Sequence, residues 1–345
     1  MRALAAVILA LILIESASAA PAFDRLDHFR ELARRYAEAP ERGVNGPLLS
    51  ELWGIVDAEV GDNLRSGEPF ASTAFIRSRL EAFSDEWGGA SFKVMDADTT
   101  TRSLLVGLFT LTQGEPRSSL RIYDRAGALV AAASHEGQLE FRPWSTAGAR
   151  LFLAKWTGAQ TGAEARTLRI ELWRLRVQSA PVREWTSDDA FPDGMAATGF
   201  SARGGQLVVR HESRYPGWKP GCMDQTEQED VYREKARSPG LALVHRRDLN
   251  AWHREFQSTV TRFFAALGAD DRATMAALVP NPSVRARLPS TLLAEPVCDE
   301  RLAGSPARAI VAATDEHDGR RVPWSLTWRR DSRGWRLTSA APMLE

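Results

Sequence analysis

The chain has 345 residues, 44% of them hydrophobic, which is enough to bury the cores of two or three domains. Its 44 Lys and Arg residues balance its 44 Asp and Glu residues, so the formal net charge is +0. This balance argues against a nucleic-acid-binding surface and against a basic membrane-binding face. We therefore expect no nucleic-acid partner.

The N-terminus has the three parts of a secretory signal peptide. Arg2 precedes an unbroken apolar run over residues 3–14, and Ala17-Ser18-Ala19 follows as an Ala-x-Ala cleavage site. We predict that residues 1–19 are a signal peptide and that the mature protein is periplasmic or secreted. No later segment has transmembrane length, so we expect no membrane span after cleavage. A retained N-terminal anchor is the alternative.

Residues 20–89 are predicted to form a helical segment. Apolar residues recur there at steps of three and four in three stretches, which is typical of amphipathic helices. Asp24 is a predicted N-cap of the first helix, Pro47 suits the first turn of the second, and Gly88-Gly89 ends the third. Each helix has one apolar stripe and needs a surface to bury it against.

Residues 90–246 are predicted to form an antiparallel β domain, because the apolar period changes from the helical spacing to two. The predicted strands are 92–95, 104–111, 120–123, 129–133, 150–156, 168–175, 199–202, 207–211, 231–234 and 241–245. Turn sequences separate them, and no helical pattern intervenes. The arrangement favours an antiparallel meander that closes into a sandwich, a barrel or a partial propeller.

A long aromatic and acidic loop interrupts this domain between residues 215 and 232. Its two Pro-Gly pairs, 216–217 and 220–221, predict two successive turns, because proline presets φ and glycine accepts the positive φ that follows. One interpretation is a binding surface. Its candidate residues are Tyr215, Trp218, Lys219, Asp224, Glu227 and Asp230. The alternative is a rigid loop that is packed on its own domain.

The loop also contains one of the two cysteines, Cys222; the other is Cys298. Export to an oxidising compartment permits a disulfide, so we predict that these two residues bond to each other. The bond would tie the loop to the C-terminal part of the chain and stabilise the protein by roughly 4 kcal/mol. Two buried free thiols are the alternative.

The sequence pattern changes again at residue 247, where a helical spacing of apolar residues returns and strand-like segments follow it up to residue 345. A strong helical stripe comes first, formed by Leu249, Trp252, Phe256, Val260, Phe263, Phe264 and Leu267. A short helix near Asp270 and predicted strands ending in Gly334-Trp335-Arg336-Leu337 follow. This order resembles the NTF2-like family of cone-shaped α+β domains. The family contains isomerases, dehydratases, ligand binders and association modules, so the resemblance implies a pocket but no particular chemistry.

The fold class predicted from these segments is α+β. It has N-terminal helices, an antiparallel β-meander as the middle domain and an NTF2-like C-terminal domain.

Linear catalytic motifs are missing from the sequence: it has no Gly-x-Ser-x-Gly, His-Glu-x-x-His, Walker, Gly-x-Gly-x-x-Gly or Cys-x-x-Cys pattern. The spacing of Asp224, Glu227 and Glu229 matches neither an EF-hand nor a zinc pattern, so we expect no metal site and no cofactor.

We therefore expect an exported, non-catalytic binding or interaction protein whose partner is an envelope protein or a small ligand. The main alternative is an enzyme with a carboxylate acid/base site in the C-terminal cone or in an interdomain cleft. A structural factor of the cell envelope is a further alternative. Whether the interior of the C-terminal cone is filled or open discriminates between a binding protein and an enzyme. If Trp252, Phe256, Phe263, Trp324 and Trp328 fill it, an active site there is disfavoured, whereas an open cavity with a buried carboxylate would favour one.

Overall fold

The computed structural model describes residues 24–38, 46–98, 103–146, 149–175, 179–235, 237–298, 306–317 and 319–343. The predicted signal peptide, residues 1–19, lies outside these ranges. Helices and antiparallel sheets make up the described chain, which confirms the α+β class. The chain divides into two compact units. The first comprises Met1–Gly114 and Ser119–Ala133, and the second comprises Glu115–Ser118 and Ser134–Glu345.

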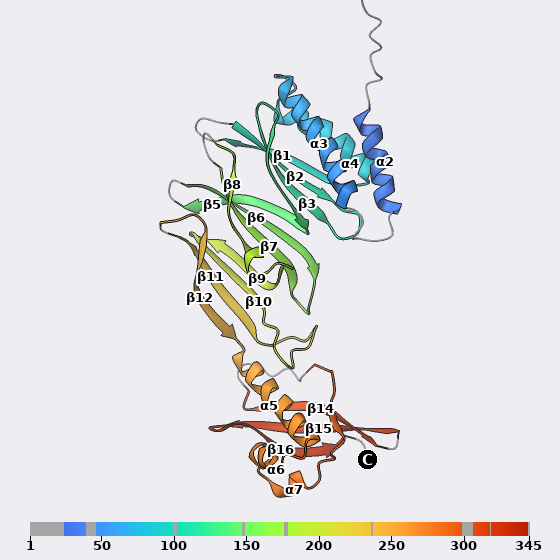
Figure 1. Cartoon of the computed structure of the whole chain (residues 1–345), viewed down its shortest axis with the longest axis vertical. Coiled ribbons are helices and arrows are strands. Elements are labelled where there is room, and N and C mark those ends of the chain that lie inside the picture. Colours follow the sequence, from blue (N-terminus) through green and yellow to red (C-terminus); the bar gives the residue numbers. More distant parts are fainter. Residues whose placement is uncertain are drawn as a thin grey trace, which may run out of the picture. The chain divides into compact units, whose positions relative to one another are not determined.

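The first unit packs three helices against a four-stranded sheet (Figure 1). The helices are α2 (Arg25–Glu38), α3 (Gly46–Arg65) and α4 (Thr73–Trp87). The sheet has the order β1-β2-β3-β4 and contains β1 (Ser91–Asp98), β2 (Ser103–Leu111), β3 (Arg117–Asp124) and β4 (Leu129–Glu136). Phe29 of α2, Val56 of α3 and Phe83 of α4 share one buried core with Leu105 and Phe109 of β2.

The ends of these helices follow from local side-chain chemistry. Asp24 accepts a hydrogen bond from the backbone N of Leu26 (2.9 Å), as expected of a residue that caps α2. Ser72 caps α4 by accepting from the backbone N of Phe75, and Gly88 ends that helix in the left-handed conformation at φ 78°. The sequence therefore specifies both ends of α4.

The second unit begins with an eight-stranded antiparallel sheet in which most strands that follow one another in sequence are neighbours. Its path is β12-β11-β10-β9-β7-β6-β5, and β8 pairs with β7. The strands are β5 (Gln138–Thr146), β6 (Ala149–Gln160), β7 (Arg166–Arg174), β8 (Val182–Thr186), β9 (Met195–Arg203), β10 (Gln206–Glu212), β11 (Glu227–Glu234) and β12 (Leu241–Leu249). Leu153, Ile170, Leu207 and Val209 form part of one buried core on this sheet. Antiparallel pairing of the predicted β region is therefore present, but its strands form two sheets, because β1 to β4 make a separate sheet against the helices.

The chain continues from β12 into a C-terminal part made of helices and a small sheet. It contains α5 (Ala251–Gly268), α6 (Arg272–Leu278), α7 (Pro282–Arg285), β13 (Leu292–Ala294), β14 (Arg308–His317), β15 (Arg320–Asp331) and β16 (Gly334–Pro342). The four strands form an antiparallel sheet in sequence order. The helices and the sheet share a single buried core.

Aromatic rings fill the interior of this C-terminal part. Phe256, Phe263 and Trp328 are each 0% exposed. The Trp328 ring lies edge-on to both Phe256 (6.1 Å) and Phe263 (5.3 Å), and Trp335 lies 4.7 Å from Phe256. Trp252 and Trp324 pack against the same core. This filling disfavours an active site inside the predicted cone.

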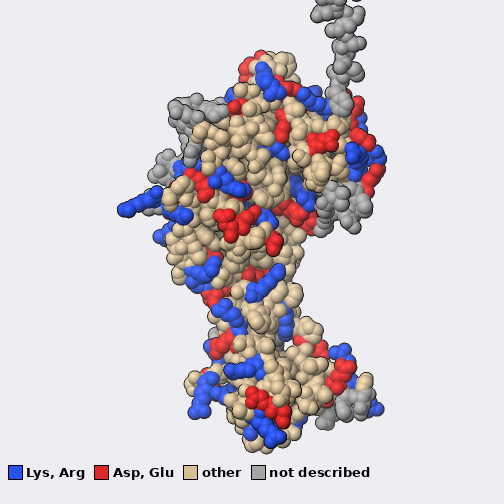
Figure 2. Space-filling view, viewed as in Figure 1, with Lys and Arg blue, Asp and Glu red and all other residues tan. Residues whose placement is uncertain are grey.

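Charges of both signs are interspersed over the face of the molecule shown in Figure 2, in keeping with the balanced composition. Within the described residues, every helix is too short or too polar to cross a membrane.

Candidate ligand pocket

The segment between β10 and β11, residues 213–226, is called here the central loop. Both predicted Pro-Gly turns are present in it. The backbone N of Trp218 donates to the carbonyl of Tyr215 (2.9 Å), and the N of Cys222 donates to the carbonyl of Lys219 (3.3 Å). The two turn glycines have φ values of 89° and 78°, a conformation that other residues rarely adopt. The local sequence therefore fixes the path of the loop.

Contacts with α5 hold the first half of the loop. The Tyr215 hydroxyl lies 2.5 Å from Nδ1 of His253 and accepts from the backbone N of Thr226 (3.2 Å). Thr226 in turn donates to the carbonyl of Asn250 (2.9 Å) and accepts from the N of Arg254 (3.0 Å). These bonds join the two ends of the loop to the start of the helix.

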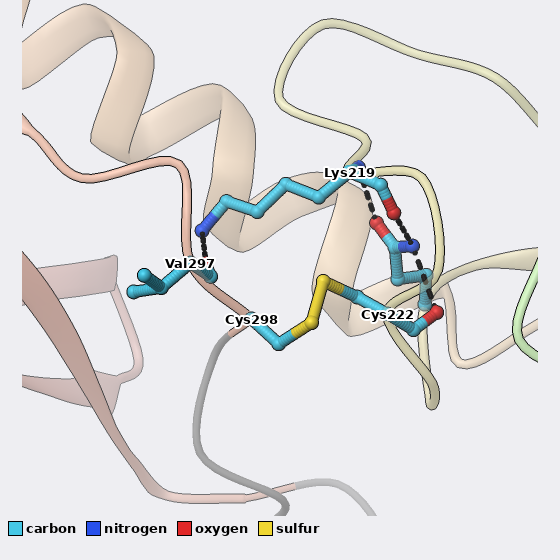
Figure 3. The surroundings of a disulfide bond; sticks show 5 residues. Lys219, Cys222, Val297 and Cys298 are labelled. Carbon is cyan, nitrogen blue, oxygen red and sulfur yellow. Dashed lines mark hydrogen bonds between the residues drawn. A yellow bond between two sulfur atoms is a disulfide. The ribbon is translucent and has the colours of Figure 1, made fainter.

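A disulfide bond between Cys222 and Cys298 holds the second half of the loop (Figure 3), as predicted. Their Cα atoms are 5.3 Å apart across a sequence separation of 76. Beside the bond, Nζ of Lys219 donates to the carbonyl of Val297 (2.7 Å). Within the loop, the Gln225 amide donates to the carbonyls of Lys219 and Cys222. The loop is therefore anchored from both sides.

A pocket of about 380 Å³ lies against this anchored loop. Five parts of the second unit line it: the β6–β7 turn, β9, the β10–β11 region, the central loop itself and the β12–α5 junction. Residues from these parts include Glu164, Thr198, Arg210, Glu212, Trp218, Met223, Asp224, Glu227 and Asn250. The volume is in the range of small-molecule sites. The pocket thus combines an aromatic and thioether wall with several carboxylates.

Two of the lining residues have backbone conformations that are uncommon outside glycine. Asp224 and Asn250 have φ values of 60° and 51°. Aspartate and asparagine tolerate this region better than other side chains, so the sequence is compatible with the geometry.

Two glutamates of the pocket lining are at facing positions on neighbouring strands. Glu212 ends β10 and Glu227 begins β11, and the two are direct partners in the antiparallel ladder. Burial raises the pKa of the Glu212 carboxyl, and the charge of Glu227 raises it further, against the opposing charge of Arg214. Burial also raises the pKa of Glu227. Nearby Glu164 and Asp224 add to this increase, while Thr198 and Arg210 oppose it. Both carboxyls are therefore easier to protonate than a solvated glutamate.

The structure distributes the six predicted site residues over three roles. Trp218, Asp224 and Glu227 line the pocket. Tyr215 and Lys219 hold the loop in place through the hydrogen bonds described above.

Asp230, the sixth, is 0% exposed and lies outside the lining. Burial alone would raise its pKa, but hydrogen bonds from Arg246 and His211 more than offset this and hold its pKa well below the usual range.

Sequence reasoning missed Glu164, Thr198, Arg210, Glu212 and Met223 as lining residues. Only the ladder register could have revealed Glu212, since it lies opposite Glu227 but is 15 positions away in sequence.

The described chain offers no group of three or more His, Cys, Asp or Glu side chains arranged to hold a metal ion. The pocket lining combines carboxylates whose pKa values are raised, Glu212 and Glu227, with the aromatic ring of Trp218 and the thioether of Met223. Arg214 stacks on the Trp218 ring at 5.2 Å, which fixes the orientation of that ring.

Comparisons of the chain with protein-family models, with curated proteins and with solved structures found no match.

Proposed function

We propose that this protein is an exported, non-catalytic binding protein whose ligand site is the pocket beside the central loop. The ligand is a small organic molecule or a side chain of an envelope partner. The observation that carries the proposal is the position of the pocket: it forms around the aromatic and acidic loop, with Trp218, Asp224 and Glu227 in its lining.

Rigid walls support a binding role. The disulfide and the Tyr215–His253 hydrogen bond hold the loop on opposite sides. A site whose walls are already ordered loses little conformational entropy when a ligand binds, so more of the contact energy is expressed as affinity. Trp218 supplies a large contact area with few rotatable bonds.

The disulfide also supports export, because such bonds persist in oxidising compartments and are rare in reducing ones. We therefore propose a periplasmic or secreted location, with cleavage after Ala19. N-terminal sequencing of the protein recovered from the envelope or the medium tests this. The expected first residue is Ala20, and recovery of an intact Met1 from the cytosol would contradict it.

We further propose that residues 247–345 form an NTF2-like domain. The order of one long helix, short helices and a four-stranded antiparallel meander supports this. Because its interior is filled by aromatic rings, we assign this domain a supporting role: it anchors the central loop through α5 and Cys298.

An enzyme with a carboxylate acid/base pair is the second candidate. The observation that favours it is the facing pair Glu212 and Glu227, whose raised pKa values suit proton transfer. The two functions differ in the fate of a bound ligand. Recovery of the ligand unchanged after prolonged incubation supports binding. Its conversion by the wild type but not by Glu212→Gln supports catalysis.

A thermal-shift screen tests the proposed function. The screen compares the wild type with Trp218→Ala and with Leu293→Ala, which removes an exposed apolar side chain outside the pocket. We expect ligands that stabilise the wild type and Leu293→Ala alike but bind Trp218→Ala about tenfold more weakly or worse, the loss typical of a buried aromatic contact. Identical responses of all three proteins would refute the choice of pocket.

A further inference from the structure

We infer that the pocket binds a positively charged organic group, an amine or a guanidinium, between Glu212 and Glu227. The inference rests on the proposed function and specifies the chemistry of its ligand. It follows from how charges are paired along neighbouring strands, and from one break in that pairing.

Acidic residues in this part of the sheet face basic residues. Glu229 of β11 is opposite Arg210 of β10 and Arg247 of β12, and it accepts hydrogen bonds from both (2.8 and 2.7 Å). Its neighbour Asp230 is opposite Arg246, which donates two bonds of 2.7 Å. Opposite charges at facing positions stabilise a sheet.

The pattern breaks at the pocket. Glu227 is opposite Glu212 on one side and Leu249 on the other, so neither adjacent strand supplies a facing cation. Like charges at directly facing positions destabilise a sheet. A cation from outside the ladder would convert this unfavourable pair into a favourable one.

The Glu212 carboxylate lines the pocket and has one oxygen whose hydrogen-bonding capacity is unused by the described residues. Its Oε2 atom is buried and makes no hydrogen bond with any described residue. Its Oε1 atom lies against the backbone of Gly162. A Cβ added to Gly162 would be 2.0 Å from this oxygen. A buried carboxylate oxygen without a donor costs free energy, which a bound N–H group would recover.

The charge around the pair is mostly acidic, although the charge of Arg214, which stacks on the Trp218 ring, opposes it at Glu212. Glu164 and Asp224 also line the pocket, and Arg210 is the lining residue of opposite charge. Arg210 donates its hydrogen bond to Glu229, outside the pocket lining, while its charge also acts on Glu227 and opposes the increase in the pKa of that carboxyl.

The preferred cation is organic rather than a metal ion. No three potential ligands of the described chain converge on a metal position. The lining supplies instead the Trp218 ring and the Met223 side chain, and Met223 is 38% exposed. Such a lining suits the methylene stem of an alkyl amine or of a Lys or Arg side chain.

Calorimetric titration at pH 7 and low salt tests the inference with three probes that share a five-carbon chain: cadaverine, 1,5-pentanediol and glutarate. N-acetyl-lysine methylamide is a fourth probe, which stands for a protein side chain. We expect cadaverine or the blocked lysine to bind at least about tenfold more tightly than the diol, as charge-assisted hydrogen bonds require. The tighter of the two cations identifies the source, a free amine or a protein side chain.

Glu212→Gln and Glu227→Gln should each weaken cation binding about tenfold or more, whereas Glu140→Gln, outside the pocket in the same sheet, should not. The Glu212→Gln variant should also unfold at a higher temperature than the wild type, because it removes the like-charge repulsion. If the Glu212 carboxylate instead stabilised the fold, the Glu212→Gln variant would unfold at a lower temperature than the wild type.

Two outcomes would overturn the inference. One is the absence of a preference for cations: neither cation binds at millimolar concentration, or the diol or glutarate binds as tightly as the cations do. The other is cation affinity that is unchanged in both glutamine variants. If a neutral or anionic compound from the thermal-shift screen still requires Trp218, the proposed function stands and only the ligand class is wrong. If no compound of any charge requires Trp218, both fail.

Discussion

The disulfide bond gives the sharpest prediction about stability. It closes a loop across a sequence separation of 76, and it joins the central loop to the C-terminal part of the chain. Replacing both Cys222 and Cys298 by serine leaves the unfolded chain free to open this loop. In the chain-entropy model, the conformational entropy of the unfolded chain then rises by about 15 cal/mol/K. This stabilises the unfolded state by about 4.5 kcal/mol at 25 °C.

Urea unfolding at pH 7, followed by tryptophan fluorescence, measures this difference. We expect the double variant to lose about 4 kcal/mol of unfolding free energy. The m value should rise, because an unfolded chain without the cross-link exposes more surface. Wild-type protein treated with a reductant is the control and should match the variant.

A loss below about 1 kcal/mol would refute the reasoning, since the loop-closure entropy could then not be the main effect of the bond. A variant that matches the wild type but differs from the reduced protein would show that the reductant acts elsewhere.

Two further predictions concern the loop and the buried carboxylate. Gly217 and Gly221 both have positive φ, but only at Gly217 would a Cβ meet Gln257 (2.9 Å). Gly217→Ala should therefore cost about 1–2 kcal/mol more than Gly221→Ala, and equal losses would contradict the packing. Arg246→Ala should cost about 2 kcal/mol at pH 7. This loss should shrink as the pH falls below about 4, because without Arg246 the buried Asp230 carboxyl becomes protonated there, whereas in the wild type Arg246 keeps it ionised to lower pH; a pH-independent loss would exclude the linkage.

Local sequence signals predicted the secondary structure well where they were strong. The stripe in α5, the cap at Asp24 and the two Pro-Gly turns each depend on residues only a few positions apart. The cysteine pair was predictable because only two cysteines exist and export permits their bonding.

The strand list was less complete. It omitted β5 and β8. Pro143 interrupts the apolar pattern of β5, and the strand tolerates it because β5 lies at the end of the sheet path, where a missing N–H donor is harmless. The change of period near residue 90 marks the first strand, but it could not show that Phe92 and Val94 share a core with the helices.

The sequence predicted only some of the residues that line the pocket. The loop was singled out by its turns, aromatic residues and carboxylates, and three of its six candidate residues line the pocket. The facing position of Glu212 could not be read from sequence, because it depends on the register between β10 and β11. The burial of Asp230 beside Arg246 depends on a second register, the one between β11 and β12.

A crystal structure of the protein grown with cadaverine tests the central claim most directly. We predict one ammonium group within about 2.7–3.0 Å of carboxylate oxygens of both Glu212 and Glu227, with the methylene chain against Trp218. Cadaverine bound only elsewhere, with the two carboxylates paired to groups of the chain itself, would contradict the account.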